Sequence, residues 1–234
     1  MQRQRPDMAQ ELALHAQGYR LIAGIDEVGR GALAGDVVAA AVILPTDPAI
    51  LERLHGVRDS KQLSARQRSI LYTTIQAEAI AIGLGRVSAQ EIDRLGIVPA
   101  TRLAMTKAVA SLAVQPDHLL IDAMRLPAVP IAQRAIIHGD ARCLSIAAAS
   151  IVAKVTRDRT MQELERVFPG YGFARHKGYG TAGHRQVLQV LHPCPIHRRT
   201  YAPVRALLPR EERQHGVEVV VPVVVGHTDV DVSP

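Results

Sequence analysis

Apolar and polar positions alternate along the chain between short strand-like runs and longer segments with helical periodicity. Five apolar runs have the length of β-strands, at residues 20–27, 36–44, 80–87, 117–123 and 133–140. Apolar residues recur at helical spacing in the segments 8–17, 64–79, 99–112 and 141–168. This alternation is typical of an α/β domain with a mixed sheet. The first two runs are joined by the sequence GRGALAG, which predicts neighbouring antiparallel strands.

Residue types at the ends of these segments support the boundaries. Ser64 is a suitable helix N-cap, and Ser88 with Glu91 has the spacing of a capping box before another short helix. A Pro-Gly pair at 169–170 ends the long helix, and Gly, His and Pro become frequent beyond it. We therefore expect a change of structure there, and we interpret the Val-rich run beyond Arg210 as a tail.

The composition is that of a globular protein with an aliphatic core. Of the 234 residues 47% are apolar and 21% are charged, but only 3% are aromatic. The formal net charge of +6 and the pI near 9.7 favour a polyanionic partner without identifying one. Two cysteines, Cys143 and Cys194, are too few for a disulfide framework, and we interpret both as packed thiols. No run resembles the apolar core of a signal peptide or a membrane span, so we expect a cytoplasmic protein.

Four acidic residues coincide with the ends of predicted strands. Asp26 and Glu27 follow an apolar run, and Asp122 and Asp140 end two later ones. Ligands bind at the carboxyl ends of strands in an α/β sheet, so we expect the four carboxylates to meet at one edge. Their repulsion raises pKa values unless cations neutralise it, and hard oxygen ligands favour Mg²⁺ or Mn²⁺. Two such ions about 4 Å apart can activate water and stabilise a leaving oxygen in phosphodiester cleavage.

A purely structural interpretation is also open for some of these acids. Asp140 directly precedes a predicted helix and is a suitable N-cap, and Asp122 could be a turn residue. For Asp26 and Glu27, next to Gly-Arg-Gly, this interpretation is harder to sustain. Adjacent residues of a regular strand point to opposite faces. Both side chains therefore reach one metal pair only if the strand ends, twists or bulges there, or if one residue contributes its main-chain carbonyl. The flanking glycines permit such irregular backbone.

Four sequence blocks together resemble the ribonuclease HII family. The sequence GIDEVGRGALAG at residues 24–35 is similar to the family's DEXGRG signature. The blocks DSKQLSARQR, GDARCLSIAAASIVAKVTRD and HKGYGT follow in the family's order. The resemblance covers about residues 18–205. Each block alone is a weak signal, whereas the combination is specific.

This resemblance implies an α/β, ribonuclease H-like fold, in which helices flank a five-stranded mixed sheet and a helical C-terminal region follows. It implies an endonuclease that hydrolyses the phosphodiester on the 5′ side of ribonucleotides in RNA–DNA hybrids or embedded in duplex DNA. The expected products have 3′-hydroxyl and 5′-phosphate ends. The family's four acidic metal ligands match Asp26, Glu27, Asp122 and Asp140, which are then both catalytic and metal-binding. Two divalent cations, Mn²⁺ or Mg²⁺, are expected during catalysis.

On this basis we divide the chain into four parts. Residues 1–17 form an N-terminal helical extension, and residues 18–170 form a ribonuclease H-like catalytic domain. Residues 171–210 form a C-terminal helical substrate-binding region, and residues 211–234 form a tail that need not be ordered. We expect a monomer that binds RNA–DNA hybrids and ribonucleotide-containing duplex DNA and does not associate with membranes.

The resemblance also assigns substrate contacts. Gly29, Arg30 and Gly31 match the loop whose backbone contacts the ribose 2′-hydroxyl, the group that distinguishes RNA from DNA. Tyr179 matches the tyrosine that packs against the sugar at the RNA–DNA junction. Its neighbouring glycines argue against the alternative of a core aromatic. For Arg30 two roles stay open, a phosphate clamp or a partner of the acids.

Four further residues are candidates for contacts with nucleic acid. Ser60 and Lys61, in a turn before a helix, could bind phosphate, although a turn with a solvated Lys also explains them. His176 and Lys177 are candidates for contacts with the DNA backbone. Other histidines lack metal-ligand spacing, and we interpret them as surface or core residues: His184, His192 and His197.

Three other functions remain open from the residues alone. A different ribonuclease H-fold nuclease, such as a Holliday junction resolvase, would share the carboxylates but would not explain Gly-Arg-Gly and Tyr179. A non-catalytic nucleic-acid-binding protein would not need converging acids, which repel phosphate when metal-free. A soluble metabolic α/β enzyme is a third class, but the chain has no GxxxxGK[ST] motif to bind a nucleotide.

Overall fold

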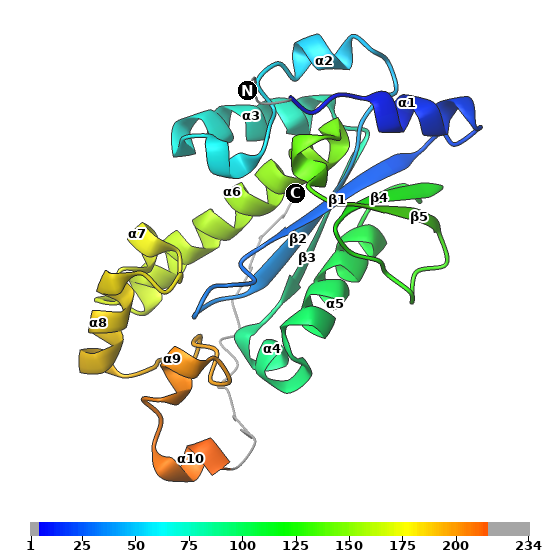
Figure 1. Ribbon diagram of the computed structural model, residues 1–234. Coiled ribbons are helices and arrows are strands. Elements are labelled where there is room, and N and C mark those ends of the chain that lie inside the picture. Colours follow the sequence, from blue (N-terminus) through cyan, green and yellow to red (C-terminus); the bar gives the residue numbers. More distant parts are fainter. Residues whose placement is uncertain (1–4, 215–234) are drawn as a thin grey trace, which may run out of the picture.

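The computed structural model describes residues 5–214, which form a five-stranded mixed sheet with helices on both faces (Figure 1). The strands are β1 Ile22–Val28, β2 Val37–Ile43, β3 Ala81–Val87, β4 His118–Asp122 and β5 Ala132–Ile136. Their spatial order is β3-β2-β1-β4-β5. The pairs β1–β2 and β2–β3 are antiparallel, whereas β1–β4 and β4–β5 are parallel. The predicted α/β fold with a five-stranded mixed sheet is confirmed.

Helices cover both faces of the sheet and form the region after it. One face carries α4 Ala89–Leu95 and α5 Ile97–Ala110, and the other carries α6 Leu144–Val167 with α1 Ala9–Ala16, α2 Ile50–Arg53 and α3 Ala65–Glu78. The chain after α6 forms α7 Phe173–His176, α8 Ala182–Leu191, α9 Ala202–Arg205 and α10 Arg210–Gln214. Two 3₁₀ turns, η1 Ser60–Gln62 and η2 Gly139–Ala141, precede α3 and α6. Within residues 5–214 no helix combines the length and the apolar character needed to cross a membrane.

The two faces of the sheet pack in separate hydrophobic cores. Odd-numbered strand positions such as Ile25 and Val37 pack in the core that includes α5. Even-numbered positions such as Ala40 and Val42 pack in the core that includes α6. Because both faces of the sheet are covered, β2 is buried at every position, and its sequence is continuously apolar rather than alternating.

Gly24 allows α6 to approach β1 closely. A Cβ at this position would lie 2.2 Å from the carbonyl carbon of Ser145, near the start of α6. The strand therefore lies directly against the helix backbone, as a glycine inside a strand permits. Two positions further along the same face is Asp26, so its side chain also comes to lie against α6.

Two boundaries differ from those expected from the sequence, and both concern Asp140. β5 ends at Ile136, so Asp140 does not end a strand but lies in η2. The helix α6 begins only at Leu144 with Cys143 as N-cap, so Asp140 is not its cap either. His138 has a left-handed conformation with a φ of 55°, which turns the chain away from the strand direction.

A buried carboxylate docks the N-terminal helix on α6. Glu11 of α1 is buried and accepts hydrogen bonds from the main-chain N and the hydroxyl of Ser145, at 3.0 and 2.6 Å. The N-cap residue of α6, Cys143, makes no capping hydrogen bond with its side chain, so Glu11 supplies this contact from another helix. At the other end of the chain, the part of the predicted tail beyond residue 214 lies outside the described residues.

Candidate active site

Asp26 lies on the face of β1 that α6 covers, and it is only 6% exposed. Its carboxylate accepts a hydrogen bond from the main-chain N of Glu27 at 2.7 Å. Burial raises the pKa of Asp26 well above its ordinary value, and the charges of Glu27 and Asp122 raise it further, against the effect of a hydrogen bond from Ser150. An ionised carboxylate is therefore costly at this position, and a bound cation would offset the cost.

Glu27 follows Asp26 in a strand that remains regular. The pairing of β1 with β2 is unbroken from Ala23 to Val28, so the two acidic side chains start on opposite faces of the sheet. Glu27 Oε1 accepts a hydrogen bond from Arg30 Nη1 at 3.2 Å, whereas its Oε2 is buried without a partner in the described part of the chain. Burial raises the pKa of Glu27, although the charge of Arg30 opposes this effect. In the structure Arg30 therefore pairs with one of the acids, and its role as a phosphate clamp stays a prediction.

Asp122 and Asp140 are connected through the turn after β5. Asp122 ends β4, and its carboxylate accepts a hydrogen bond from the main-chain N of Gly139 at 2.7 Å. This bond holds the 3₁₀ turn η2, in which Asp140 is buried. Burial raises the pKa of Asp140, and the charges of Asp59 and Asp122 add to the effect. Asp122 thus acts electrostatically on the other three predicted ligands.

Lys61 supplies a positive charge among these acids. Its Nζ lies 3.9 Å from Asp140 Oδ2, and its side chain is 82% exposed. Burial lowers the pKa of Lys61, but the charges of Asp59 and Asp140 outweigh this effect, so that the pKa is raised. Because an exposed ion pair contributes little stability, the ammonium can leave Asp140 for an incoming phosphate at little cost.

The acids suit a hard divalent cation but do not form a finished metal site. Within the described part of the chain, no three His, Cys, Asp or Glu side chains are arranged to hold one metal ion as they stand. The donors nevertheless fit Mg²⁺ or Mn²⁺, because they are carboxylate oxygens in a cluster of raised pKa values. The buried Oε2 of Glu27, which has no hydrogen-bond partner among residues 5–214, also suits coordination of a cation. Carboxylate side chains would have to turn towards the ion on binding.

The Gly-Arg-Gly sequence forms the turn after β1, and its two glycines differ in their surroundings. Gly29 has a φ of 94°, and a Cβ there would lie 2.3 Å from Nε of Arg157. At Gly31 an added Cβ would meet no atom of the described residues within 4 Å. Packing therefore explains the glycine at position 29, whereas the space beside Gly31 is left open by the protein itself.

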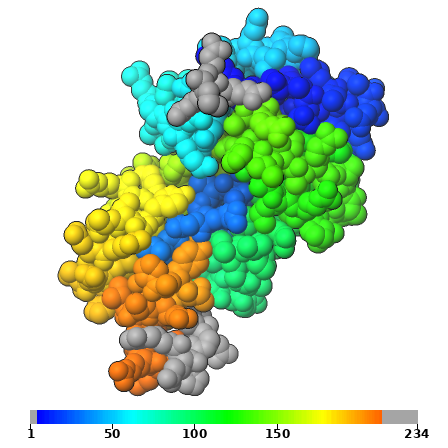
Figure 2. All heavy atoms as spheres, viewed as in Figure 1, coloured from blue at the N-terminus to red at the C-terminus, as the bar shows by residue number. Residues whose placement is uncertain are grey.

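Tyr179 lies beside this turn, although the two are far apart in the sequence. The main-chain N of Leu33 donates to the carbonyl of Gly178 at 2.8 Å, and Ala32 pairs with Tyr179 in an isolated antiparallel bridge. Gly178 has a φ of 79°, and a Cβ there would lie 2.4 Å from the carbonyl oxygen of Ala34. In Figure 2 the blue surface of the β1–β2 region lies between yellow and green parts of the chain. The fold thus brings Tyr179 into main-chain contact with the residues that directly follow the predicted sugar-binding turn.

The sequence GYGTAG at residues 178–183 also fits the GxGxxG pattern of dinucleotide-binding sites. That pattern requires a preceding strand, but here the segment follows the short helix α7 Phe173–His176. Gly178 and Gly180 instead lie close to Ala34 and Leu33 in the segment after β1, so the pattern does not indicate a nucleotide site.

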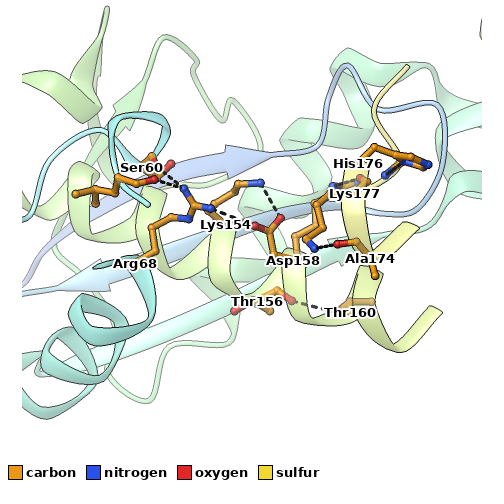
Figure 3. Close-up of polar contacts among 12 residues, drawn as sticks. Ser60, Arg68, Lys154, Thr156, Asp158, Thr160, Ala174, His176 and Lys177 are labelled. Atoms are coloured by element: carbon orange, nitrogen blue, oxygen red, sulfur yellow. Dashed lines mark hydrogen bonds and ion pairs between the residues drawn. The ribbon is translucent and has the colours of Figure 1, made fainter. Parts of the chain in front are cut away.

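Ser60 is buried rather than exposed to a phosphate. Its hydroxyl lies 2.9 Å from that of Ser150, which in turn forms a hydrogen bond with Asp26. Arg68 donates to the carbonyl of Ser60 at 3.0 Å and lies 3.6 Å from Asp158 of α6 (Figure 3). Ser60 therefore supports Asp26 through Ser150, and its hydroxyl is not placed for the phosphate contact expected from the sequence.

His176 and Lys177, at the end of α7, are tied to main-chain groups (Figure 3). His176 Nε2 lies 2.8 Å from the carbonyl oxygen of Tyr171, and its Nδ1 accepts a hydrogen bond from the main-chain N of Gly178 at 3.2 Å. Lys177 has a φ of 54° and donates from its ammonium to the carbonyl of Ala174. His176 thus has no ring nitrogen left for phosphate, whereas the Lys177 ammonium has further protons to donate.

A buried arginine outside the predicted site residues joins the segment after β1 to the segment that carries Tyr179. Arg157 of α6 is 1% exposed and donates to the carbonyl oxygens of Asp36, Lys177 and Ala34, at 2.9, 2.8 and 3.0 Å. Its guanidinium carbon lies 5.4 Å from the centre of the Tyr179 ring. Arg157 therefore contacts both the segment after β1 and the segment that carries Tyr179.

A second buried arginine, Arg198, holds the same turn from the C-terminal side. It is 0% exposed and donates to the carbonyl oxygens of Arg30 and Gly35 at 2.8 and 2.9 Å. For Arg157 a signal was available in the sequence, because apolar residues stand four positions before and after it on the helix. For Arg198 we find no such signal.

The fold and the site define the class of the protein first: it is a nuclease with the ribonuclease H fold. The ribonuclease H2 of Pyrococcus horikoshii OT3 is similar over 80% of this chain and 96% of its own, with a TM-score of 0.69 and 28% sequence identity. Bst-RNase HIII in complex with Mn²⁺ shares the fold over 85% of this chain and 72% of its own, with a TM-score of 0.65 at 21% identity.

Sequence comparison then identifies the family. The model of the family described as Ribonuclease HII matches residues 23–204. Ribonuclease HII of Chloroflexus aggregans is 56% identical over 206 residues, which are 87% of this chain and 96% of that protein. The chain belongs to the ribonuclease HII family, as the resemblance of its motifs predicts, and it is an endoribonuclease that acts on RNA–DNA hybrids.

Proposed function

We propose that the protein hydrolyses the phosphodiester on the 5′ side of a ribonucleotide, both in RNA–DNA hybrids and at single ribonucleotides in duplex DNA. The products would have 3′-hydroxyl and 5′-phosphate ends. The observation that carries the proposal is the main-chain contact of Ala32 and Leu33, which directly follow Gly-Arg-Gly, with Tyr179 and Gly178. Because the Gly-Arg-Gly turn begins two residues after Glu27, the groups that would read the sugar lie close in the chain to those that would act on the phosphodiester.

The four acids would act through divalent cations. Asp26, Glu27, Asp122 and Asp140 would hold two Mn²⁺ or Mg²⁺ ions, which lower the pKa of an attacking water and stabilise charge on the leaving oxygen. The raised pKa values of three of the acids support this role, since a cation relieves the repulsion that raises them. Bst-RNase HIII binds Mn²⁺, which supports Mn²⁺ as one of the two candidates.

Selection of a ribose would depend on the turn after β1. The open space beside Gly31 would let main-chain groups approach a 2′-hydroxyl, which is both a donor and an acceptor. The half-buried ring of Tyr179 would pack against the sugar at the junction. A deoxyribose lacks the hydroxyl, so an all-DNA duplex would bind without this alignment.

Basic side chains would bind the phosphates. Lys61 and Lys177 are placed near the acids and near Tyr179 respectively, and the net charge of +6 favours a polyanion. Such contacts supply affinity without distinguishing ribose from deoxyribose. The monomeric state and the cytoplasmic location stay predictions.

A pair of duplexes tests the proposed reaction. One carries a single ribonucleotide in a 5′-labelled strand, and the other has the same sequence in DNA only. We expect Mn²⁺- or Mg²⁺-dependent cleavage of the first alone, with a labelled product that ends before the ribonucleotide and that a DNA polymerase can extend. Equal cleavage of both duplexes, or a cut on the 3′ side of the ribonucleotide, would overturn the proposal.

A further inference from the structure

A pair of buried histidines lies next to Tyr179 and away from the carboxylates. His184 of α8 is 0% exposed and His197 is 1% exposed, and their Nε2 atoms are 3.1 Å apart. Both rings lie against Phe173, with ring centres 5.7 and 5.6 Å from it. Of the three histidines interpreted as surface or core residues, these two are in the core and His192 is exposed. Their ring nitrogens are all engaged, however, which packing alone does not require.

The groups at the two ends of the pair determine which nitrogen of each ring carries a proton. His184 Nδ1 lies 3.0 Å from the carbonyl oxygen of Tyr179, which can only accept, so His184 donates from Nδ1. A neutral His184 then accepts at Nε2, and His197 donates to it from Nε2. The remaining Nδ1 of His197 accepts from the main-chain N of Cys194 at 3.0 Å, while the Cys194 carbonyl is further away at 3.3 Å.

Both rings are neutral near pH 7. Burial lowers the pKa of His184 and of His197 to about 4 in each case. The hydrogen bonds therefore run in one direction, from the main-chain N of Cys194 through the two rings to the carbonyl of Tyr179. If either neutral ring carried its proton on the other nitrogen, at least one of these close contacts would join two donors or two acceptors.

The same segment also contacts the turn after β1. His197 pairs with Ala34 in an isolated antiparallel bridge, and the next residue, Arg198, donates to the carbonyl of Arg30. The two histidines therefore connect the backbone of Tyr179 to the segment that holds the Gly-Arg-Gly turn. Their effect would be to keep the two parts at a constant distance.

We propose that His184 and His197 are positioning residues that set the place of Tyr179 relative to the Gly-Arg-Gly turn. The proposal rests on the proposed function, in which Tyr179 packs against the sugar. Neither histidine touches the substrate, and both act through the Tyr179 carbonyl. Loss of the connection should lower kcat on a ribonucleotide-containing duplex, because alignment is lost. It should change KM less, because phosphate contacts supply most of the affinity.

Asparagine and glutamine variants test the direction of the hydrogen bonds. The Asn amide corresponds in position to Nδ1 of histidine, and the Gln amide corresponds to Nε2. His184→Asn keeps a donor for Tyr179, whereas His184→Gln does not. At position 197 the order should reverse, since His197→Gln keeps the donor for His184 and His197→Asn does not. We expect kcat to fall about tenfold in the disrupting variant of each pair and less in the other, with His192→Asn as an unaffected control.

A second background separates this proposal from the role of Tyr179 itself. In Tyr179→Ala proteins the two His184 variants should have equal kcat, because the side chain that they position is gone. A Tyr179→Ala protein with normal kcat would overturn the proposed role of Tyr179. Impaired Tyr179→Ala together with equal, near-normal kcat in all four histidine variants would overturn the positioning proposal and leave the role of Tyr179 intact.

Nitrogen NMR of the wild-type protein provides a test that does not depend on the folding of any variant. At pH 7 we expect His184 to be protonated at Nδ1, the less common neutral form, and His197 at Nε2. His184 protonated at Nε2 would overturn the proposal whatever the kinetics. Unchanged signals of both rings down to pH 5 would support it, since a charged ring breaks the sequence of donors and acceptors.

Discussion

The guanidinium carbon of Arg157 lies 5.4 Å from the centre of the Tyr179 ring, and Nη1 of the same group donates to the carbonyl of Lys177 at 2.8 Å. Its other nitrogens donate to the carbonyls of Ala34 and Asp36. The planar fork of an arginine can reach three carbonyls in different directions, which an ammonium group cannot do in the same way. The position of Tyr179 therefore depends on a residue whose nitrogens are all directed at the protein.

Arg157→Lys should lower both stability and activity. Lysine keeps the charge but leaves carbonyl groups without a donor, so we expect the free energy of unfolding in urea to fall by about 2 kcal/mol. We expect kcat on a duplex with one ribonucleotide to fall about tenfold. Arg53→Lys, in an exposed pair with Glu78, is the matched control and should change neither quantity. A folded Arg157→Lys protein with normal kcat would contradict the prediction.

Asp26→Asn should abolish cleavage and leave the fold intact. Asparagine keeps the size of the side chain but removes a charge that would hold a metal ion, so we expect kcat to fall on the order of 10³-fold. Adding Mg²⁺ or Mn²⁺ should raise the Tm of the wild-type protein, because the cation relieves repulsion among the acids. The variant should lose most of this increase. If the Asp26→Asn variant were as active as the wild type at saturating Mg²⁺, Asp26 would be excluded as a metal ligand.

The two glycines of the Gly-Arg-Gly turn should respond differently to the same change. Gly29→Ala should destabilise the protein by about 2 kcal/mol or more, because its φ is 94° and the new methyl group would collide with Arg157. Gly31→Ala should fold normally, since no atom of residues 5–214 lies within 4 Å of the added carbon. It should still lose activity on ribonucleotide-containing duplex with little loss of affinity. Thermal unfolding, cleavage and duplex-binding assays separate these outcomes. A fully active Gly31→Ala variant would show that this position does not contact the sugar.

Lys61→Ala should weaken duplex binding without regard to sequence. If the exposed ammonium binds one phosphate, the slope of log K against log salt concentration should become shallower by about 1. Lys107→Ala is the control, because Lys107 pairs with Glu91 on the α5 side of the sheet and should leave the slope unchanged. Titrations at several salt concentrations measure both slopes. An unchanged slope in Lys61→Ala would indicate that Lys61 contacts only the acids.

Glu11→Gln should make stability less dependent on pH. Burial raises the pKa of Glu11 above its value of 4.5 in the unfolded chain. Its contribution to stability is therefore fully present below pH 4.5 and is lost as the pH rises through the folded-state pKa. Glutamine does not titrate, so the free energy of unfolding of the wild type minus that of the variant should fall as the pH is raised towards 8. Urea denaturation across this range measures the difference, and a constant difference would be incompatible with a raised pKa.

The elements and the family can be predicted from the order of residues alone, because both depend on local patterns. Ser64 and Ser88 act as N-caps through residues three positions away, as predicted, and such contacts are visible in the order of residues. β1 ends one residue after Glu27 and β4 ends at Asp122, close to the predicted ends, because the apolar runs stop there. The end of β5 was predicted four residues too late, because the left-handed turn at His138 has no local sequence signal.

The contacts that hold the loops around the site depend on segments far apart in the chain. Ser60 reads as an exposed turn residue, yet it is buried against Ser150, ninety positions away in the chain. Arg157 and Arg198 have no role predicted from the sequence, yet both are buried because main-chain carbonyls from other segments satisfy their donors. No periodicity records which carbonyls will face a guanidinium, since their positions follow from the packing of α6 and the C-terminal helices on the sheet. Contacts of this kind are fixed by the three-dimensional arrangement of whole elements, and therefore they cannot be read from the neighbours of a residue in the chain.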